Sequence, residues 1–368
     1  MAFKFDIDES FANEIPRVAR ERIDRVTESL TEKPRPSAES IHSARKDLKS
    51  LRALLRLARG SIANDVRQGE NLIFRDIGRS LSALRDSQAL VEALKKFAKG
   101  KSRTNSKNSV TQKEARSEFI QKVRNGIEQG AVKELPDETL KQLKENLHGA
   151  SRSVADWLDL VSFEPEDEWE VFVGRGLRRT YRQGKNLVSQ LETLGKENAG
   201  DETWHELRKS AKALGYQMRL LRPIWPELTG PLLEQFDQLT DRLGDDHDLV
   251  VLRGRLLNEP YKASETQKAA DVRRNLIDSL ERRRRKLQME AFKIARRIYA
   301  EKPRQFESRI RSYWRLSQAK RPGRDGAPEV RHSEKPASQK RTALQSKKGS
   351  VRPPCPPARS RSRVTSGN

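Results

Sequence analysis

The chain has 368 residues, of which 34% are apolar and 35% are charged, and its formal net charge is +23. This composition excludes a deeply buried parallel sheet, and no run of about 20 uncharged apolar residues is present to span a membrane. The single cysteine, Cys355, excludes an intrachain disulfide and a cysteine-based zinc site, while the charge predicts a polyanionic partner.

Helical periodicity predicts an all-α fold from about residue 11 to residue 317. The first helix is expected to end at a proline-rich break, after which Ser37 is the predicted N-cap of the next helix. Breaks marked by Pro, Gly, Ser or acidic clusters are predicted at 31–40, 99–109, 162–169 and 195–203.

The two ends of the chain differ from this helical region. The first ten residues lack the basic and then apolar pattern of a signal peptide, so we expect a cytoplasmic protein. Residues 318–368 have few large apolar side chains and hold 13 Lys/Arg against 3 Asp/Glu, a net charge of +10. Such a segment cannot offset the entropy of ordering, which predicts a disordered basic tail.

The chain also contains an internal repeat. The segment IHSARKDLKSLRALLRL at 41–57 aligns with WHELRKSAKALGYQMRLL at 204–221, with an offset of 163 residues between His42 and His205. A second pair, 74–94 and 236–256, follows in the same order at an offset of 162. Two matches in one order predict a duplicated helical unit of about 160 residues.

Each copy of the first segment carries cations on one helix face and apolar residues on another. At 100° per residue, the cations of 42–56 share a face that excludes Asp47, and those of 205–219 share a face that excludes Glu206. Like charges at these spacings repel, so a solvated surface would ordinarily intersperse acids. Because the acid-free face occurs twice, we favour a shared polyanion site over a simple solvated face.

A further basic stripe runs through GRGLRRTYRQGKNLV at 174–188, with Arg175, Arg178, Arg182 and Lys185 at helical spacing. The corresponding N-terminal segment, IPRVARERIDRV, is interrupted by acids. Either an exposed face or a binding face explains this stripe.

These segments, together with LRDSQALVEAL and LTDRLGDDHDLVVL, resemble the CHAD domain, the conserved histidine α-helical domain. The resemblance covers about residues 5–317. It implies two tandem four-helix bundles, at about 5–150 and 165–317, related by a pseudo-twofold axis around a basic channel or groove. It further implies non-enzymatic binding of inorganic polyphosphate, association with polyphosphate granules, and no cofactor, metal or catalytic residue.

By position, the resemblance implies one set of polyphosphate-binding residues drawn from both halves. The set is His42, Arg45, Lys46, Lys49, Arg52, Arg56, Arg85, Arg178, Arg182, His205, Arg208, Lys209, Lys212, Arg219 and His247. One departure is Gly215, which stands where the family usually has an arginine and which aligns with Arg52.

Two alternatives remain open. The charge and the basic tail also suit a general polyanion-binding or nucleic-acid-binding protein, although no helix-turn-helix, zinc-finger spacing or aromatic RNA-binding motif is present. The dipeptide His247–Asp248 suits a metal-dependent phosphohydrolase, but the repeat places Arg85 opposite His247, and arginine does not bind metals.

Overall fold

The structure is a computed structural model, and it describes residues 3–31, 36–99, 110–132, 134–158, 163–195, 198–258 and 266–319. Over these ranges it contains eleven α-helices and no strand, which confirms the predicted all-α fold. No helix in the described ranges is long and apolar enough to cross a membrane.

Helices begin at Ala38 and Asp201, inside the predicted breaks at 31–40 and 195–203, whereas residues 100–109 of another predicted break lie outside the described residues. The breaks at 81–82 and 221–225 were not predicted. Ser37 is the N-cap of α2, and its side chain accepts a hydrogen bond from the Ser40 N–H at 3.1 Å. The elements are α1 (Phe11–Thr31), α2 (Ala38–Leu57), α3 (Asn64–Ser80), α4 (Ala83–Lys99), α5 (Val110–Gln129), α6 (Asp137–Ser153), α7 (Arg175–Leu194), α8 (Asp201–Leu220), α9 (Pro226–Leu257), α10 (Gln267–Ile298) and α11 (Pro303–Ala319). Short helical turns lie at Val154–Leu158, Pro165–Asp167, Glu170–Gly174 and Arg222–Ile224.

The two copies of the repeat use the same helix order with different breaks. Helices α1 and α2 of the first copy correspond to α7 and α8 of the second. The pair α3 and α4 corresponds to α9, and the pair α5 and α6 corresponds to α10. The Leu81–Ser82 turn that separates α3 from α4 corresponds to the uninterrupted middle of α9. The second copy therefore has two helices of 32 residues where the first has pairs of shorter ones.

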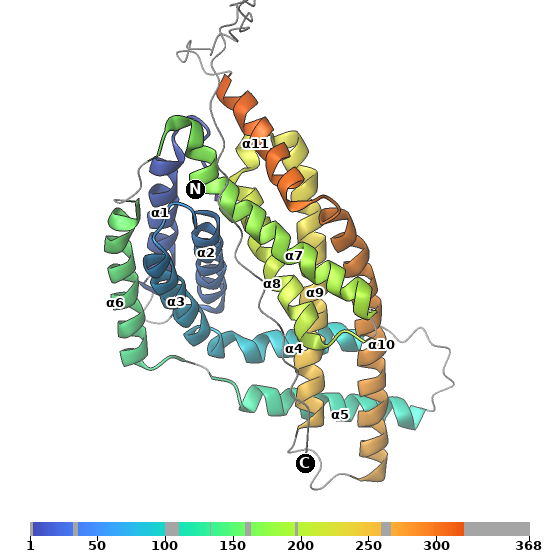
Figure 1. Cartoon of the computed structure of the whole chain (residues 1–368). Helices are drawn as coiled ribbons and strands as arrows, with labels where there is room; N and C mark the ends of the chain where they lie inside the picture. Colours follow the sequence, from blue (N-terminus) through green and yellow to red (C-terminus); the bar gives the residue numbers. More distant parts are fainter. Residues whose placement is uncertain are drawn as a thin grey trace, which may run out of the picture. The chain divides into compact units, whose positions relative to one another are not determined.

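The helix contacts cross between the two halves of the chain. Helices α1, α2, α3 and α6 contact one another, and α7, α8 and α9 form a continuous second group with α10 and α11 (Figure 1). Helices α4 and α5, however, pack against α9 and α10. Their apolar faces form a second core with residues such as Phe119, Leu252 and Leu280. Arrangement as two separate four-helix bundles stays a prediction.

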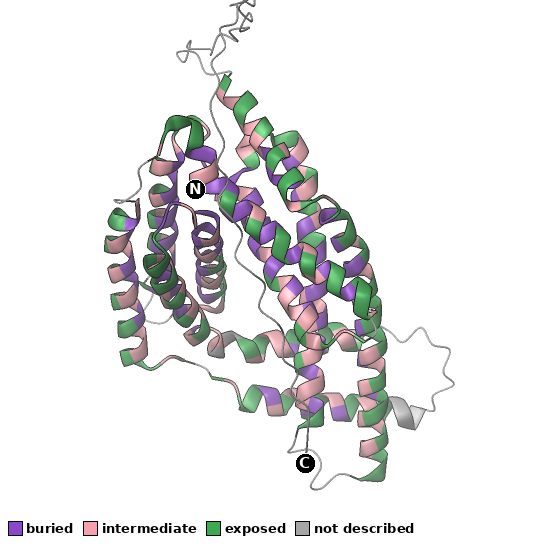
Figure 2. Ribbon diagram, in the orientation of Figure 1, coloured by how far each residue is buried: buried purple, intermediate pink, exposed green. Residues whose placement is uncertain are grey.

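Helices α2 and α8 lie side by side where the two halves meet, and both contact α7. The buried Gln217 amide of α8 donates to the Ala53 carbonyl of α2 at 3.3 Å and to the Thr180 hydroxyl of α7 at 3.1 Å. Their buried faces are mainly Leu and Ala, as the apolar stripes predict (Figure 2). This packing leaves the cationic faces of the two helices at the edges of one shared interface.

The described residues, from 3 to 319 with the gaps given above, form one compact unit. Helix α11 continues to Ala319, so residues 318 and 319 of the predicted tail are helical. The predicted disorder of the rest of the tail concerns 320–368, which lie outside the described residues.

Candidate anion-binding site

The basic faces of α2 and α8 meet at residues that the repeat relates to each other. The pKa of Arg208 is lowered, mainly by burial. The charge of Asp248 opposes this decrease, and the charge of Arg45 on α2 adds to it. Arg45 and Arg208 therefore lie close enough for their charges to interact, although they are 163 positions apart. We call Arg45, His205, Arg208, Lys209, Lys212 and His247 the central cation cluster.

Lys212 is the ammonium group most affected by this crowding. Its side chain is half-buried, and burial together with Arg208 and Arg45 lowers its pKa to about 8, against the opposing effect of Asp241 and Asp248. A lysine in water has a pKa near 10.5. The free protein therefore holds a cation here at an electrostatic cost that a bound polyanion would remove.

The two histidines of the cluster stack on each other. The rings of His205 in α8 and His247 in α9 have centroids 4.6 Å apart at an interplanar angle of 29°. Burial, Arg208 and His205 lower the pKa of His247 to about 4, and burial with Lys209 and Arg208 lowers that of His205. His247 is thus neutral at pH 7, so it offers hydrogen bonds rather than charge.

Two nitrogen atoms in the cluster are buried without a partner. Among the described residues, neither Nδ1 of His205 nor Nε of Arg208 has a hydrogen-bond partner. The Nε–H of Arg208 can therefore donate to a bound acceptor.

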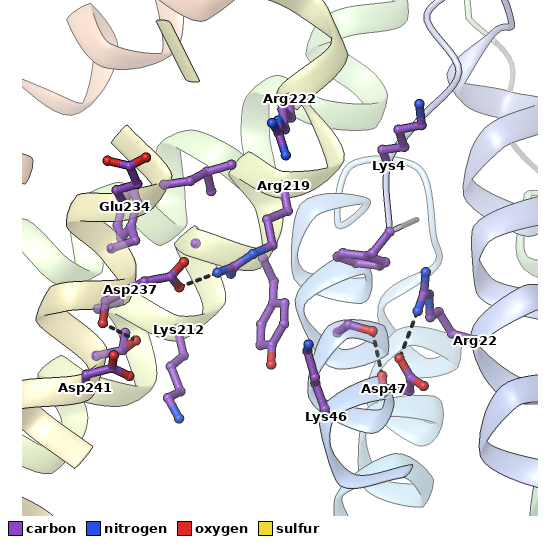
Figure 3. Close-up of a pocket in the computed structure, with 18 of the residues that line it drawn as sticks. Lys4, Arg22, Lys46, Asp47, Lys212, Arg219, Arg222, Glu234, Asp237 and Asp241 are labelled. Carbon is purple, nitrogen blue, oxygen red and sulfur yellow. Dashed lines mark hydrogen bonds and ion pairs between the residues drawn. The ribbon is translucent and has the colours of Figure 1, made fainter. Parts of the chain in front are cut away.

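Beside the cluster, a cavity of about 840 Å³ opens between α1, α2, α8 and α9 (Figure 3). Lys46 and Lys212 border it from α2 and α8, whereas Asp237 and Asp241 border it from α9. The cavity is therefore not uniformly basic. Its cationic residues are Lys4, Arg22, Arg25, Lys46, Lys212, Arg219 and Arg222.

The α1 arginines of this cavity were not among the sequence candidates. Arg22 and Arg25 pair with the buried Asp47 at 2.9 Å and 3.3 Å. Asp47, which the helix geometry placed off the basic face, is thus the anchor between α2 and α1. The pairing depends on packing between two helices, so no pattern within either helix could have indicated it.

The remaining candidates on α2 differ in how exposed their side chains are. His42, Lys46 and Lys49 are exposed, whereas Arg52 and Arg56 are half-buried. Arg52 donates through Nε to Asn71 of α3 at 3.0 Å, and burial with neighbouring arginines lowers its pKa to about 10. Burial also lowers the pKa of Arg56. Arg52 therefore extends the basic surface toward α3.

Several predicted cations pair with acids. Arg45 lies 3.8 Å from Asp86, and Arg219 pairs with Asp237 while its guanidinium lies 5.5 Å from the centre of the Tyr216 ring. An incoming polyanion would compete with these carboxylates. The surface is thus partly neutralised by the protein itself.

The predicted candidates on α7 are not brought into the cluster. Arg178 pairs with Glu170 at 2.7 Å and with Glu307 at 3.2 Å, and the Trp169 indole donates to Glu307 at 2.7 Å. Arg178 therefore joins α7 to α11. Arg182 is exposed on α7. The side chain of Arg85, on α4, lies outside the described residues.

Gly215 lines the cavity, where the family pattern has an arginine. A Cβ built there would lie 3.4 Å from Cβ of Phe236 and 3.6 Å from Nη1 of Arg219, which is ordinary contact. The backbone therefore accepts a Cβ at this position.

His247 and Asp248 were also considered as metal ligands. Within the described ranges, no group of three or more His, Cys, Asp or Glu side chains is placed to hold a metal ion. The positive charges of Arg208, Lys209 and Lys212 lower the pKa of His247, and the charge of neighbouring Asp248 acts on Arg208 and Lys212. The position is thus surrounded by charges of both signs.

Two comparisons with known proteins bear on the chain. No curated protein matches it. The model of the CHAD domain matches residues 13–257, which include α2, α8, α9 and every member of the central cation cluster. A match of this extent confirms the resemblance drawn from the repeated histidine helices, and the chain belongs to the CHAD domain family.

Proposed function

We propose that this protein binds inorganic polyphosphate, without catalysis, through the central cation cluster and the adjoining basic face of α2. The observation that carries the proposal is the convergence of Arg45, Arg208 and Lys212 from two repeat-related helices. Cations held this close destabilise one another, and a chain of phosphates relieves that repulsion.

The residue types suit a phosphate chain. An arginine fork can bind two phosphate oxygens at once, and a lysine presents a compact point charge. The two stacked histidines add neutral hydrogen-bond donors beside the cations. With aromatic residues at 6% of the chain, base stacking has a small part to play, which favours an inorganic polyanion over single-stranded nucleic acid.

A charge-removal variant tests the proposal. We expect Arg45→Gln, Lys49→Gln, Arg208→Gln and Lys212→Gln together to weaken binding of long-chain polyphosphate by at least about a hundredfold at 0.1 M salt, because four phosphate contacts are removed. Binding is measured by titration calorimetry, and the helical content of the variant by circular dichroism.

The matched control removes four exposed cations elsewhere: Arg20→Gln, Lys141→Gln, Arg152→Gln and Arg315→Gln. Its net charge change is the same, so it should bind polyphosphate much more tightly than the cluster variant. Equal loss in both variants would mean that total charge, and not the cluster, determines binding.

The general polyanion-binding alternative is separated by competition. If the cluster is built for polyphosphate, duplex DNA at equal phosphate concentration should not displace polyphosphate from it. Displacement at similar concentrations would support a general polyanion site.

The phosphohydrolase alternative is separated by chemistry. It predicts a bound metal in the purified protein and release of phosphate from polyphosphate or a phosphate ester. The binding proposal predicts that polyphosphate keeps its length on incubation with the protein, with and without added Mg²⁺ or Mn²⁺.

The proposed binding also gives a proposed location. A protein that binds polyphosphate should be found in the cytoplasm on polyphosphate granules. A fluorescent fusion of the wild-type chain should mark these granules, and the cluster variant should not.

A further inference from the structure

A second strongly basic surface lies on α10, separate from the central cation cluster. The segment ERRRRKLQMEAFKIARR at 281–297 has one acid after its first residue, Glu290. Glu290 pairs with Arg242 of α9 at 2.9 Å. We call six exposed residues of this segment the outer cation stripe: Arg282, Arg285, Lys286, Lys293, Arg296 and Arg297.

The stripe occupies one side of the helix. At 100° per residue, its members fall within about 60° on either side of Arg282. Leu280, Leu287 and Ala291 are buried on the opposite side. Figure 2 shows exposed residues along much of α10. The stripe spans about 23 Å at 1.5 Å per residue.

Most cations of the stripe have no acid to neutralise them. Arg296 pairs with Glu192 of α7 at 2.9 Å. In the part of the chain that the structure describes, the other five have no carboxylate within ion-pair distance. Glu281 and Glu290 stand four residues from Arg285 and Lys286, but they pair with Arg253 and Arg242 of α9 instead. The like charges of the stripe therefore repel one another along the helix.

The stripe lies outside the residues that the CHAD model matches. The CHAD match ends at residue 257, before α10 begins at Gln267. Nor does the stripe have a basic counterpart in the first copy, where α6 carries Glu138 and Glu145 among its lysines. The stripe is thus a feature of this chain beyond the matched region.

We propose that the outer cation stripe binds the phosphate backbone of duplex nucleic acid, independently of base sequence. The stripe lies along one face of a single helix, so a ligand would contact its cations from one side. A flexible polyanion would lose conformational entropy on binding there and would gain contacts on one side only. A stiff duplex loses less entropy, because its phosphates are already fixed at one charge per about 1.7 Å of axis.

The side chains of the stripe agree with backbone contact. Four of the six are arginines, which form paired hydrogen bonds to phosphate oxygens. The nearest aromatic residue of the segment, Phe292, is buried and is not available for stacking on an unpaired base. These features favour a duplex over a single strand.

The test replaces four members of the stripe in the full-length chain: Arg282→Gln, Arg285→Gln, Lys286→Gln and Lys293→Gln. We expect binding of a random-sequence 30-base-pair DNA duplex to weaken by at least about tenfold at 0.1 M salt. We also expect the slope of log affinity against log salt to fall in magnitude by about 3 to 4. Both are measured by fluorescence anisotropy.

Controls separate the effect of the stripe from that of total charge and from that of the cluster. The variant of Arg20, Lys141, Arg152 and Arg315 has the same charge change and should keep most of the wild-type affinity for the duplex. The cluster variant of Arg45, Lys49, Arg208 and Lys212 should also bind the duplex, because it retains the stripe. The wild-type chain should bind duplex and polyphosphate at the same time.

Three outcomes would overturn the proposal. One is an unchanged affinity and salt slope in the stripe variant, and another is equal loss in the stripe variant and its matched control. The third is loss of polyphosphate binding, with duplex binding retained, which would assign the stripe to polyphosphate. If the cluster variant keeps its affinity for polyphosphate, that result contradicts the proposed function but leaves the proposal for the stripe intact.

Discussion

At the scale of single residues, the surroundings of a cation decide what it contributes. Lys212 and Lys209 lie one helical turn apart on α8, yet Lys209 is exposed and pairs with Glu206 at 2.6 Å, whereas Lys212 is half-buried among cations. This crowding lowers the pKa of Lys212 to about 8. The more crowded lysine gains more from a polyanion.

This difference predicts a pH dependence of polyphosphate binding. Lys212 is mostly charged at pH 7 and mostly neutral at pH 9 in the free protein, and a bound polyanion raises its pKa toward the ordinary value. Affinity should therefore fall by about fivefold between pH 7 and pH 9 at 0.1 M salt, with proton uptake on binding above pH 8. Titration calorimetry in buffers of different ionisation enthalpy measures both.

The Lys212→Arg variant is the control for this pH dependence. An arginine stays protonated over the whole range, so its affinity should change much less between pH 7 and pH 9. The same fall in Lys212→Arg as in the wild type would assign the titration to another group.

At the scale of helices, the site depends on how closely α7 approaches α2. A Cβ at Gly176 of α7 would collide with the carbonyl oxygens of Arg56 and Leu57. These are backbone atoms, which cannot move aside as a flexible side chain would. Gly176 therefore sets the position of the helix on which Arg52 and Arg56 lie.

Substitution of glycines by alanine tests this contact. We expect Gly176→Ala to lower the free energy of unfolding by about 1–3 kcal/mol, because overpacking strains both helices. In contrast, Gly149→Ala in α6 meets no atom within 4 Å and should raise stability by up to about 1 kcal/mol. Urea unfolding followed by circular dichroism measures both free energies. Similar free energies of unfolding for the two variants would show that α7 and α2 can move apart at little cost.

At the scale of the whole molecule, charge is divided between a folded part and a terminal segment. Residues 318–368 carry +10 of the total +23, so +13 remains on the preceding residues. Charges outside a binding site act over about 10 Å at 0.1 M salt and over about 3 Å at 1 M salt. Terminal charge should therefore speed association at low salt and have little effect at high salt.

Deletion of residues 320–368, which begin directly after α11, tests this division. The truncated chain should associate with polyphosphate more slowly than the full chain at 50 mM salt, whereas at 500 mM salt the two should have nearly equal rates and affinities. Stopped-flow fluorescence measures the rates. If the truncated chain fails to bind at 500 mM salt while it remains folded, the principal site lies in the deleted segment.

Much of the fold, and the helix faces that form the candidate site, could be predicted from the sequence alone. Helical periodicity, the Ser37 cap and the repeat of His42 at His205 determine which residues share a helix face, because that relation depends only on local geometry. The family follows from the same residues. The ERRRR segment of α10 is also apparent in the sequence, but it has no counterpart in the first copy of the repeat, so the repeat does not indicate a function for it.

Only the tertiary structure decided what each face contacts. Arg178 and Arg208 look alike on their own helices, yet Arg178 pairs with Glu170 and Glu307 while Arg208 lies near Arg45. The difference arises because helices distant in the sequence supply the neighbours, and these neighbours set burial and local potential. Local geometry thus determines which cations lie together on a helix, and packing determines which of them face a partner.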